Sequence, residues 1–197
     1  MTRLGIKFCT LLFLSFLIWF LIPAETHAAK IRKPVWSGQF YPAQADHLRQ
    51  MINTLTQQTQ KTPFQIPAGK NLKALIMPHA GYIYSGLTAA HVSRVLHKNQ
   101  FRKVILMAPD HRIGFANGMI SNVDAYQTPL GRIQLHSEAS GLRRSSPLFD
   151  SDAASDQKEH AVEVILPFLQ HYLNRFQLIP MVMGPGHIGK MAHAIIP

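Results

Sequence analysis

Apolar positions recur along the chain with the spacing of helices in some stretches and run without a break in others. Residues 43–58 carry apolar side chains at i, i+3, i+4 and i+7, which predicts an amphipathic helix. Short apolar runs at residues 72–77 and 103–107 predict buried strands, and the periodic stretch 85–96 between them predicts a helix. Strand, helix and strand in this order are typical of a βαβ unit, whose parallel strands end at the same edge of a sheet.

The second half of the chain predicts further elements of both kinds. They are, in order, a strand at residues 119–123, a turn at 127–131, a strand at 132–135, a short helix at 137–146, a polar exposed stretch at 150–156, a helix at 158–173, a third core strand at 176–183 and a last helix from about residue 187. Pro167 predicts a kink or a break in the longest of these helices. The whole pattern predicts one sandwich-like α/β domain, with a central, largely parallel or mixed sheet flanked by helices.

The N-terminal residues have the layout of an export signal. Two basic residues lie within residues 1–7, residues 8–24 carry no charge, and residues 26–28 place small side chains where signal peptidase cuts. The apolar stretch is somewhat long, so an uncleaved membrane anchor is the alternative. Residues 1–28 are therefore expected to be a signal peptide or anchor, and residues 29–197 an exported domain in the periplasm or another extracytoplasmic space.

Charge and cysteine content narrow the chemistry of that domain. The only cysteine of the chain, Cys9, lies in the N-terminal segment and outside that domain. Any metal in the domain must therefore be held by nitrogen and oxygen, which favours iron(II), copper(II) or zinc. The formal net charge is +10 for the whole chain. Because the basic residues are scattered, we expect a solvated basic surface that an anionic membrane attracts weakly, and no nucleic-acid partner.

Two histidines directly follow the predicted neighbouring strands. His79 comes after residues 72–77 and His111 comes after residues 103–107. Neighbouring strands lie about 5 Å apart, so both imidazoles could bind one metal ion at about 2.1 Å. The alternative is a pair of histidines that are hydrogen-bonded within strand-end loops.

A third group of polar residues lies in the predicted helix at residues 158–173. On a helix, Glu159 and His160 can each share a face with Glu163, which follows them by four and three residues. A carboxylate beside His160 could orient the imidazole as a metal ligand or as an acid/base. A solvated polar face is the alternative for this group.

Five stretches together carry a family resemblance. They read, in chain order, VWSGQFYP (35–42), PHAGYIYSG (78–86), APDH (108–111), YQTPLG (126–131), and EHAVE with LPF (159–168). In sequence and order they resemble the MEMO family, also called AmmeMemoRadiSam system protein B. That family is similar to the class III extradiol dioxygenases, α/β proteins that bind non-haem iron(II) at a strand edge.

The resemblance implies a metal site. It implies that His79 and His111 are two ligands of a divalent metal, iron(II) first and copper or zinc as alternatives, and that His160 lies beside the pocket as an acid/base. The family's third ligand and a further pocket histidine come later than residue 197, so we expect a domain that is truncated at its C-terminus, with weaker metal binding and a tendency to aggregate.

Three functions remain open at this point. The first is a metal-dependent redox protein, such as an extradiol-type oxygenase that acts on a small aromatic or other chelating molecule. The second is a non-enzymatic protein that binds a peptide, a metabolite or a metal in a pocket walled by aromatic side chains, namely Trp36, Phe40, Tyr41 and Tyr82. The third is an inactive fragment of a longer protein.

Overall fold

The computed structural model describes residues 28–61 and 65–195, so the predicted signal or anchor lies outside it except for Ala28. The described strands form two sheets. The 3-stranded sheet has the order β1 (Ile31–Arg32), β4 (Ala125–Thr128), β5 (Gly131–Gln134). The 4-stranded sheet has the order β2 (Lys103–Pro109), β7 (Gln177–Met183), β3 (Gly118–Met119), β6 (Phe149–Asp150).

Strands β2 and β7 are the longest pair and confirm two of the three predicted core strands. They run parallel, in register from Lys103 opposite Gln177 to Pro109 opposite Met183. Strand β3 adds antiparallel to the other side of β7, so this sheet is mixed. The protein is thus a single α/β domain with mixed sheets, as the sequence predicts.

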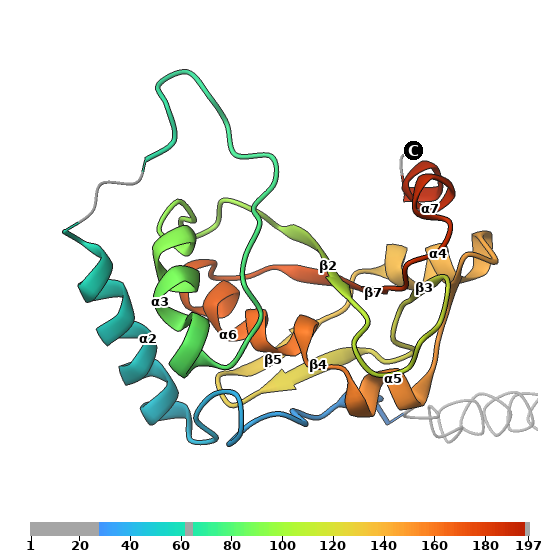
Figure 1. Cartoon of the computed structure of the whole chain (residues 1–197), viewed down its shortest axis with the longest axis horizontal. Coiled ribbons are helices and arrows are strands. Elements are labelled where there is room, and N and C mark those ends of the chain that lie inside the picture. Colours follow the sequence, from blue (N-terminus) through green and yellow to red (C-terminus); the bar gives the residue numbers. More distant parts are fainter. Residues whose placement is uncertain (1–27, 62–64, 196–197) are drawn as a thin grey trace, which may run out of the picture.

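Helices pack at both ends of the molecule. Figure 1 shows α2 (Ala45–Thr59), α3 (Tyr82–Ser93) and α6 (Ala161–Tyr172) gathered at one end, and α4 (Ser137–Ser145) and α7 (Ile188–Ile195) at the other. Helix α6 is buried along most of its length and contributes to two of the three hydrophobic clusters. It continues without a break through Pro167, where a kink or a break was expected. None of the helices in the described ranges is both long and apolar enough to cross a membrane.

The prediction of a strand at residues 72–77 is wrong. This segment has no regular structure, and no backbone hydrogen bond joins residues 71–79 to any other described residue. Its apolar side chains Leu72, Leu75 and Met77 still pack against the main core, which explains the apolar run in the sequence. The expected βαβ unit therefore lacks its first strand, and this segment is not hydrogen-bonded to β2.

The predicted helix at residues 158–173 is also wrong at its start. Helix α5 (Ala153–Lys158) ends first, Glu159 is extended at φ −81° and ψ 133°, and α6 begins at Ala161. The Glu159 carboxylate accepts hydrogen bonds from the backbone N–H groups of His160 and Ala161 at 2.8 and 2.9 Å, which offers the chain an alternative to continuing the helix. Glu159 and Glu163 consequently do not share a helix face.

Smaller differences concern the stretches between the core elements. The stretch at 150–156, expected to be exposed, contains most of the first turn of α5, and Ser155 in it is buried. The predicted turn at 127–131 is shorter, because β4 extends to Thr128 and pairs antiparallel with β5. The strand predicted at 119–123 is reduced to β3. None of these differences moves the two parallel core strands.

Candidate metal centre

Three histidines converge at the C-terminal end of β2. His111 follows β2, His79 precedes α3, and His160 directly precedes α6. The ring centroids lie 5.2 Å apart for His79 and His111, 4.6 Å for His111 and His160, and 6.0 Å for His79 and His160. The structure therefore brings the two predicted metal ligands and the predicted acid/base into one cluster.

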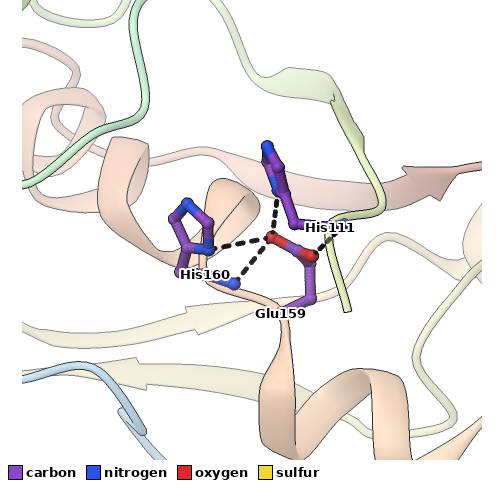
Figure 2. A group of neighbouring side chains, drawn as sticks. All are labelled: His111, Glu159 and His160. Atoms are coloured by element: carbon purple, nitrogen blue, oxygen red, sulfur yellow. Dashed lines mark hydrogen bonds and ion pairs between the residues drawn. The ribbon is translucent and has the colours of Figure 1, made fainter. Parts of the chain in front are cut away.

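Glu159 fixes the position of His111. One carboxylate oxygen, Oε1, lies 3.0 Å from Nδ1 of His111, and the other, Oε2, accepts the backbone N–H of His111 at 2.7 Å (Figure 2). Because an ionised carboxylate only accepts hydrogen bonds, Nδ1 of His111 is the protonated nitrogen. The lone pair of Nε2 is then the one available to a metal ion, the usual arrangement of a metal-binding histidine with a carboxylate partner.

The Glu159 carboxylate is held in its charged form inside the protein. Its residue is only 2% exposed. Burial alone would raise the pKa of Glu159, but hydrogen bonds from the side chain and backbone of His111 and from the backbone of Ala161 lower it below its ordinary value. A negative charge therefore lies permanently beside the histidine cluster.

His160 has a buried ring nitrogen without a hydrogen bond. Its Nδ1 lies 3.2 Å from Oε1 of Glu159, but not in hydrogen-bonding geometry, and it has no partner among the described residues. In Figure 2 the other ring nitrogens of His111 and His160 both point away from Glu159, toward the same side. Two ring nitrogens therefore face one space beside the carboxylate.

Two of the three histidines are shifted toward the neutral form. Burial lowers the pKa of His79, and the nearby His111 lowers it further. Burial also lowers the pKa of His160, which the charge of Glu159 offsets only in part. Neutral imidazoles are the form that binds metal ions, so the surroundings prepare these rings as ligands at neutral pH.

Aromatic side chains cover one side of His160. The ring centroid of Phe40 lies 4.7 Å from that of His160, and the centroid of Trp36 lies 5.8 Å from it. Trp36 and Phe40 also contact each other edge to face at 4.9 Å, and the Arg112 guanidinium lies 5.1 Å above the Trp36 ring. Of the predicted pocket residues, these two line the histidine cluster.

Glu159, also a predicted pocket residue, bonds to His111, whereas the three remaining ones, Tyr41, Tyr82 and Glu163, lie in the interior behind the site. Tyr82 is 3% exposed and donates its hydroxyl to the backbone oxygen of Val164. Glu163 is fully buried and accepts the hydroxyl of Tyr41 at 2.6 Å. None of the polar groups of Tyr41, Tyr82 and Glu163 bonds to a histidine of the cluster in the described structure.

Arg32 is a site-supporting residue that sequence reasoning missed. It is buried, donates from Nη1 to Glu163 at 2.7 Å, and donates from Nη2 to the backbone oxygen of Glu159 at 3.0 Å. One guanidinium thus ties Glu163 to the turn that carries Glu159. Nothing in the sequence distinguishes Arg32 from the other basic residues of the chain, since Lys30 and Lys33 lie beside it.

The donors of the cluster suit a divalent metal ion held by nitrogen. Three imidazoles, two of them shifted toward neutrality, are the ligand type that iron, copper and zinc share. One ligand atom from each of His111, Glu159 and His160 lies within 4.8 Å of the others, so the carboxylate is a further donor within reach.

Comparison with known proteins agrees with this architecture. The family model described as "Memo-like protein" matches residues 32–195. A MEMO1 family protein of Nitrosopumilus maritimus is 34% identical over 156 residues, which cover 78% of this chain and 56% of that protein. A MEMO1 family protein of Methanopyrus kandleri is 36% identical over 161 residues, which likewise cover 78% of this chain and 56% of that protein.

A third relative gives a slightly longer match. A MEMO1 family protein of Methanothermobacter thermautotrophicus is 33% identical over 174 residues, which cover 84% of this chain and 62% of that protein. The chain thus spans little more than half the length of the relatives it matches. All three histidines and the elements that carry them lie inside the matched region, and the chain belongs to the Memo-like family.

Proposed function

We propose that this protein binds one divalent metal ion through His79 and His111, with iron(II) as the preferred metal. The observation that carries the proposal is the 5.2 Å separation of the two rings, together with the hydrogen bond that leaves Nε2 of His111 available. Copper and zinc accept the same nitrogen donors and are the alternatives.

His160 is the acid/base group of the proposal. Its ring lies 4.6 Å from that of His111, and burial keeps its neutral form favoured, so it can accept a proton from a molecule bound next to the metal. Glu159 stabilises the protonated form that results, because its carboxylate oxygen lies 3.2 Å from Nδ1 of His160. Glu159 is thus a positioning residue for one histidine and a charge partner for the other.

The reaction class that fits best is a redox reaction of the extradiol oxygenase type. Iron(II) held by His79 and His111 would supply a centre that binds a chelating molecule and activates O₂. On the protein side, Trp36 and Phe40 form an apolar wall at His160 against which a small aromatic substrate packs. Substrate orientation and proton uptake are the tasks of this chain's own residues.

A non-enzymatic binding function is the second candidate. The observation that favours it is the aromatic wall with the Arg112 guanidinium above Trp36, since aromatic and arginine side chains are typical of binding surfaces for peptides and metabolites. A metal ion would then hold the ligand without turnover. Oxygen consumption with catechols, measured on the metal-loaded protein, separates the two candidates.

We also propose that the domain acts outside the cytoplasm, because residues 1–28 have the layout of an export signal or membrane anchor. Sequencing the N-terminus of the protein from its native cell tests this. A chain that begins near Ala29 supports cleavage. A membrane-bound chain that retains residues 1–28 supports the anchor, and a chain with these residues in the cytosolic fraction contradicts the proposal.

The metal content of the purified protein tests the main proposal. The wild type, His79→Ala and His111→Ala are purified without chelator, supplied anaerobically with iron(II), desalted and analysed for metal. We expect the wild type to hold metal and each variant to hold less than about a tenth of the wild-type amount, because each variant removes one of two ligands. His97→Ala, an exposed histidine on the loop after α3, is the matched control and should retain the metal.

Two results would contradict metal binding at this site. One is a wild-type protein that holds no metal after reconstitution. The other is metal that stays bound in both His79→Ala and His111→Ala. His160→Gln should retain most of the metal, which separates its acid/base role from that of a ligand.

A further inference from the structure

Arg112 places a positive charge beside the histidine cluster. It directly follows His111 on the loop after β2, and it is exposed. Its guanidinium lies 5.1 Å above the ring of Trp36, and the centroid of that ring lies 5.8 Å from the centroid of His160. The charge is also close enough to His160 to be one of the causes that lower the pKa of this imidazole. Trp36 therefore lies in contact with both the cation and the histidine cluster.

The guanidinium of Arg112 keeps its hydrogen-bonding capacity. The backbone N–H of this residue donates to Oδ1 of Asp110 at 3.0 Å, but in the part of the chain that the structure describes the guanidinium itself has no hydrogen bond and no ion pair. A guanidinium that lies over an aromatic ring still directs its N–H groups outward in its own plane, where their spacing matches the two oxygens of a carboxylate. Its donors are thus held at the site and remain unused.

The two carboxylates next to the cluster are engaged by other groups. Asp110 accepts the backbone N–H groups of residues 112–114 at 3.0, 3.0 and 2.6 Å, which fixes the loop that carries the guanidinium. Glu159 accepts from the side chain and the backbone of His111. In the metal-loaded protein, these two negative charges balance the two positive charges of a divalent ion. The charge of Arg112 is then left for a ligand.

We propose that this site takes an anionic molecule, a chelating aromatic compound with a carboxylate group, and that Arg112 determines this specificity by binding the carboxylate. The chelating part of the inference rests on the proposed metal function, whereas the anionic part rests on Arg112. The aromatic ring of the molecule packs on Trp36 and Phe40, and Trp36 contacts both His160 and Arg112. A neutral compound of the same shape leaves the guanidinium without a partner.

The strength of the preference follows from the kind of bond. Hydrogen bonds between a guanidinium and a carboxylate are charge-assisted and often paired, which makes them about twice as strong as neutral ones. Because Arg112 is exposed, water screens part of the attraction. We therefore expect about a tenfold difference in affinity between a carboxylate and its neutral counterpart.

Calorimetric titration of the whole chain tests the preference. The probes are 3,4-dihydroxybenzoate and its methyl ester, which has the same ring and hydroxyl groups but no charged carboxylate. Both are titrated at neutral pH into the zinc-loaded and into the metal-free protein. Zinc has no redox chemistry, so binding is measured without turnover. We expect the acid to bind about tenfold more tightly than the ester in both forms, with weaker binding of both compounds in the metal-free one.

Three variants connect the preference to Arg112. Arg112→Gln removes the charge and should bring the two dissociation constants within about threefold of each other, by weakening the binding of the acid and leaving that of the ester nearly unchanged. Arg112→Lys keeps the charge without the planar fork and should retain part of the preference. Arg144→Gln, which removes an exposed arginine near the end of α4, is the matched control and should keep the wild-type ratio.

Three results would overturn the inference: the wild type binds both compounds equally or not at all, Arg112→Gln keeps the preference, or Arg144→Gln abolishes it as well. Any of them in a protein that holds zinc leaves the proposed metal function intact. Conversely, a protein that holds no zinc but shows an Arg112-dependent preference for the acid contradicts the metal function and supports the anionic specificity.

Discussion

The Arg32 guanidinium donates to the Glu163 carboxylate at 2.7 Å in the interior of the protein, where the two side chains are 5% and 0% exposed. The same carboxylate accepts three more hydrogen bonds, all from the segment after β1, namely the N–H groups of Val35 and Trp36 and the hydroxyl of Tyr41. One buried charge on α6 therefore holds the N-terminal segment that carries the aromatic wall of the site.

Glu163→Gln should strongly destabilise the protein. The amide leaves the buried Arg32 charge without its nearest counter-ion, with only Asp156 at 3.8 Å, and offers one acceptor oxygen to four donors, so we expect a loss of about 3–5 kcal/mol in the free energy of unfolding. Urea denaturation followed by circular dichroism measures it. Glu138→Gln, which removes a charge paired with the exposed Lys103, is the control and should change the stability far less, because an exposed ion pair is screened by solvent. Equal effects of the two substitutions would contradict a structural role for Glu163.

Glu159→Gln should weaken metal binding without removing a ligand. The carboxylate accepts from Nδ1 of His111, and a neutral amide holds that imidazole less firmly and makes it a poorer donor, so we expect a loss of about 10–100-fold in metal affinity. Competition with a chelator of known affinity measures it. Unchanged affinity in a variant that still unfolds cooperatively would show that Glu159 does not orient the ligand.

The stability of the metal-free protein should decrease as the pH falls from about 7.5 to about 5.5. Burial lowers the pKa of His79, His160 and His171, so below their ordinary value of about 6.5 the unfolded chain binds more protons than the folded protein. Stability is therefore lost through this window. The lowered pKa of Glu159 acts only below about pH 4.5, where that carboxylate begins to titrate in the unfolded chain.

The midpoint of urea unfolding, measured across that pH window, checks the expectation. His160→Gln should reduce the slope, because it removes one of the shifted groups, whereas His97→Gln should leave the slope unchanged. A midpoint that rises as the pH falls would contradict the assignment of neutral, buried imidazoles. In the metal-loaded protein the decrease should be steeper, since protons compete with the metal for the same nitrogens.

Met107→Lys should reduce self-association. Met107 is 53% exposed beside the unpaired edge of β2, and Ile105 is exposed next to it, so two chains can meet at this apolar edge. We expect the variant to remain monomeric at several-fold higher concentration, as measured by light scattering. Lys98→Met, which adds an exposed apolar side chain on the loop after α3, should not change the onset of association if the edge is responsible.

The elements with strong local signals were predictable. The parallel pair β2 and β7 follows from two apolar runs, and helix α2 follows from its apolar period. The convergence of His79 and His111 was also predicted, from the rule that neighbouring parallel strands end at one edge. The two rings lie 5.2 Å apart, although residues 72–77 are not hydrogen-bonded to β2. Side chains of residues 72–77 and of β2 pack on the same core cluster, and this packing brings the ends of both segments together.

What the sequence did not reveal depends on contacts between distant residues. The pattern at 158–173 predicts one helix, but the Glu159 side chain bonds to its own following backbone and to His111, and this ends the helical run. The spacing of apolar residues does not reveal that a side chain competes with the helix for backbone N–H groups. The same holds for Arg32, whose partner lies 131 residues away in the chain. The predicted βαβ unit pairs residues 72–77 with β2, but an apolar run does not identify the strand with which a segment forms hydrogen bonds.

The bond from Arg32 to the backbone oxygen of Glu159 has a practical consequence for shortened forms of this protein. A variant that began after Arg32 would retain every histidine of the cluster, yet would lose the cation that secures the Glu159 turn and would leave the Glu163 carboxylate buried without its cationic partner. The N-terminal boundary of the smallest form that keeps an ordered site therefore lies at or before Lys30, whose backbone N–H is itself bonded to Asp124.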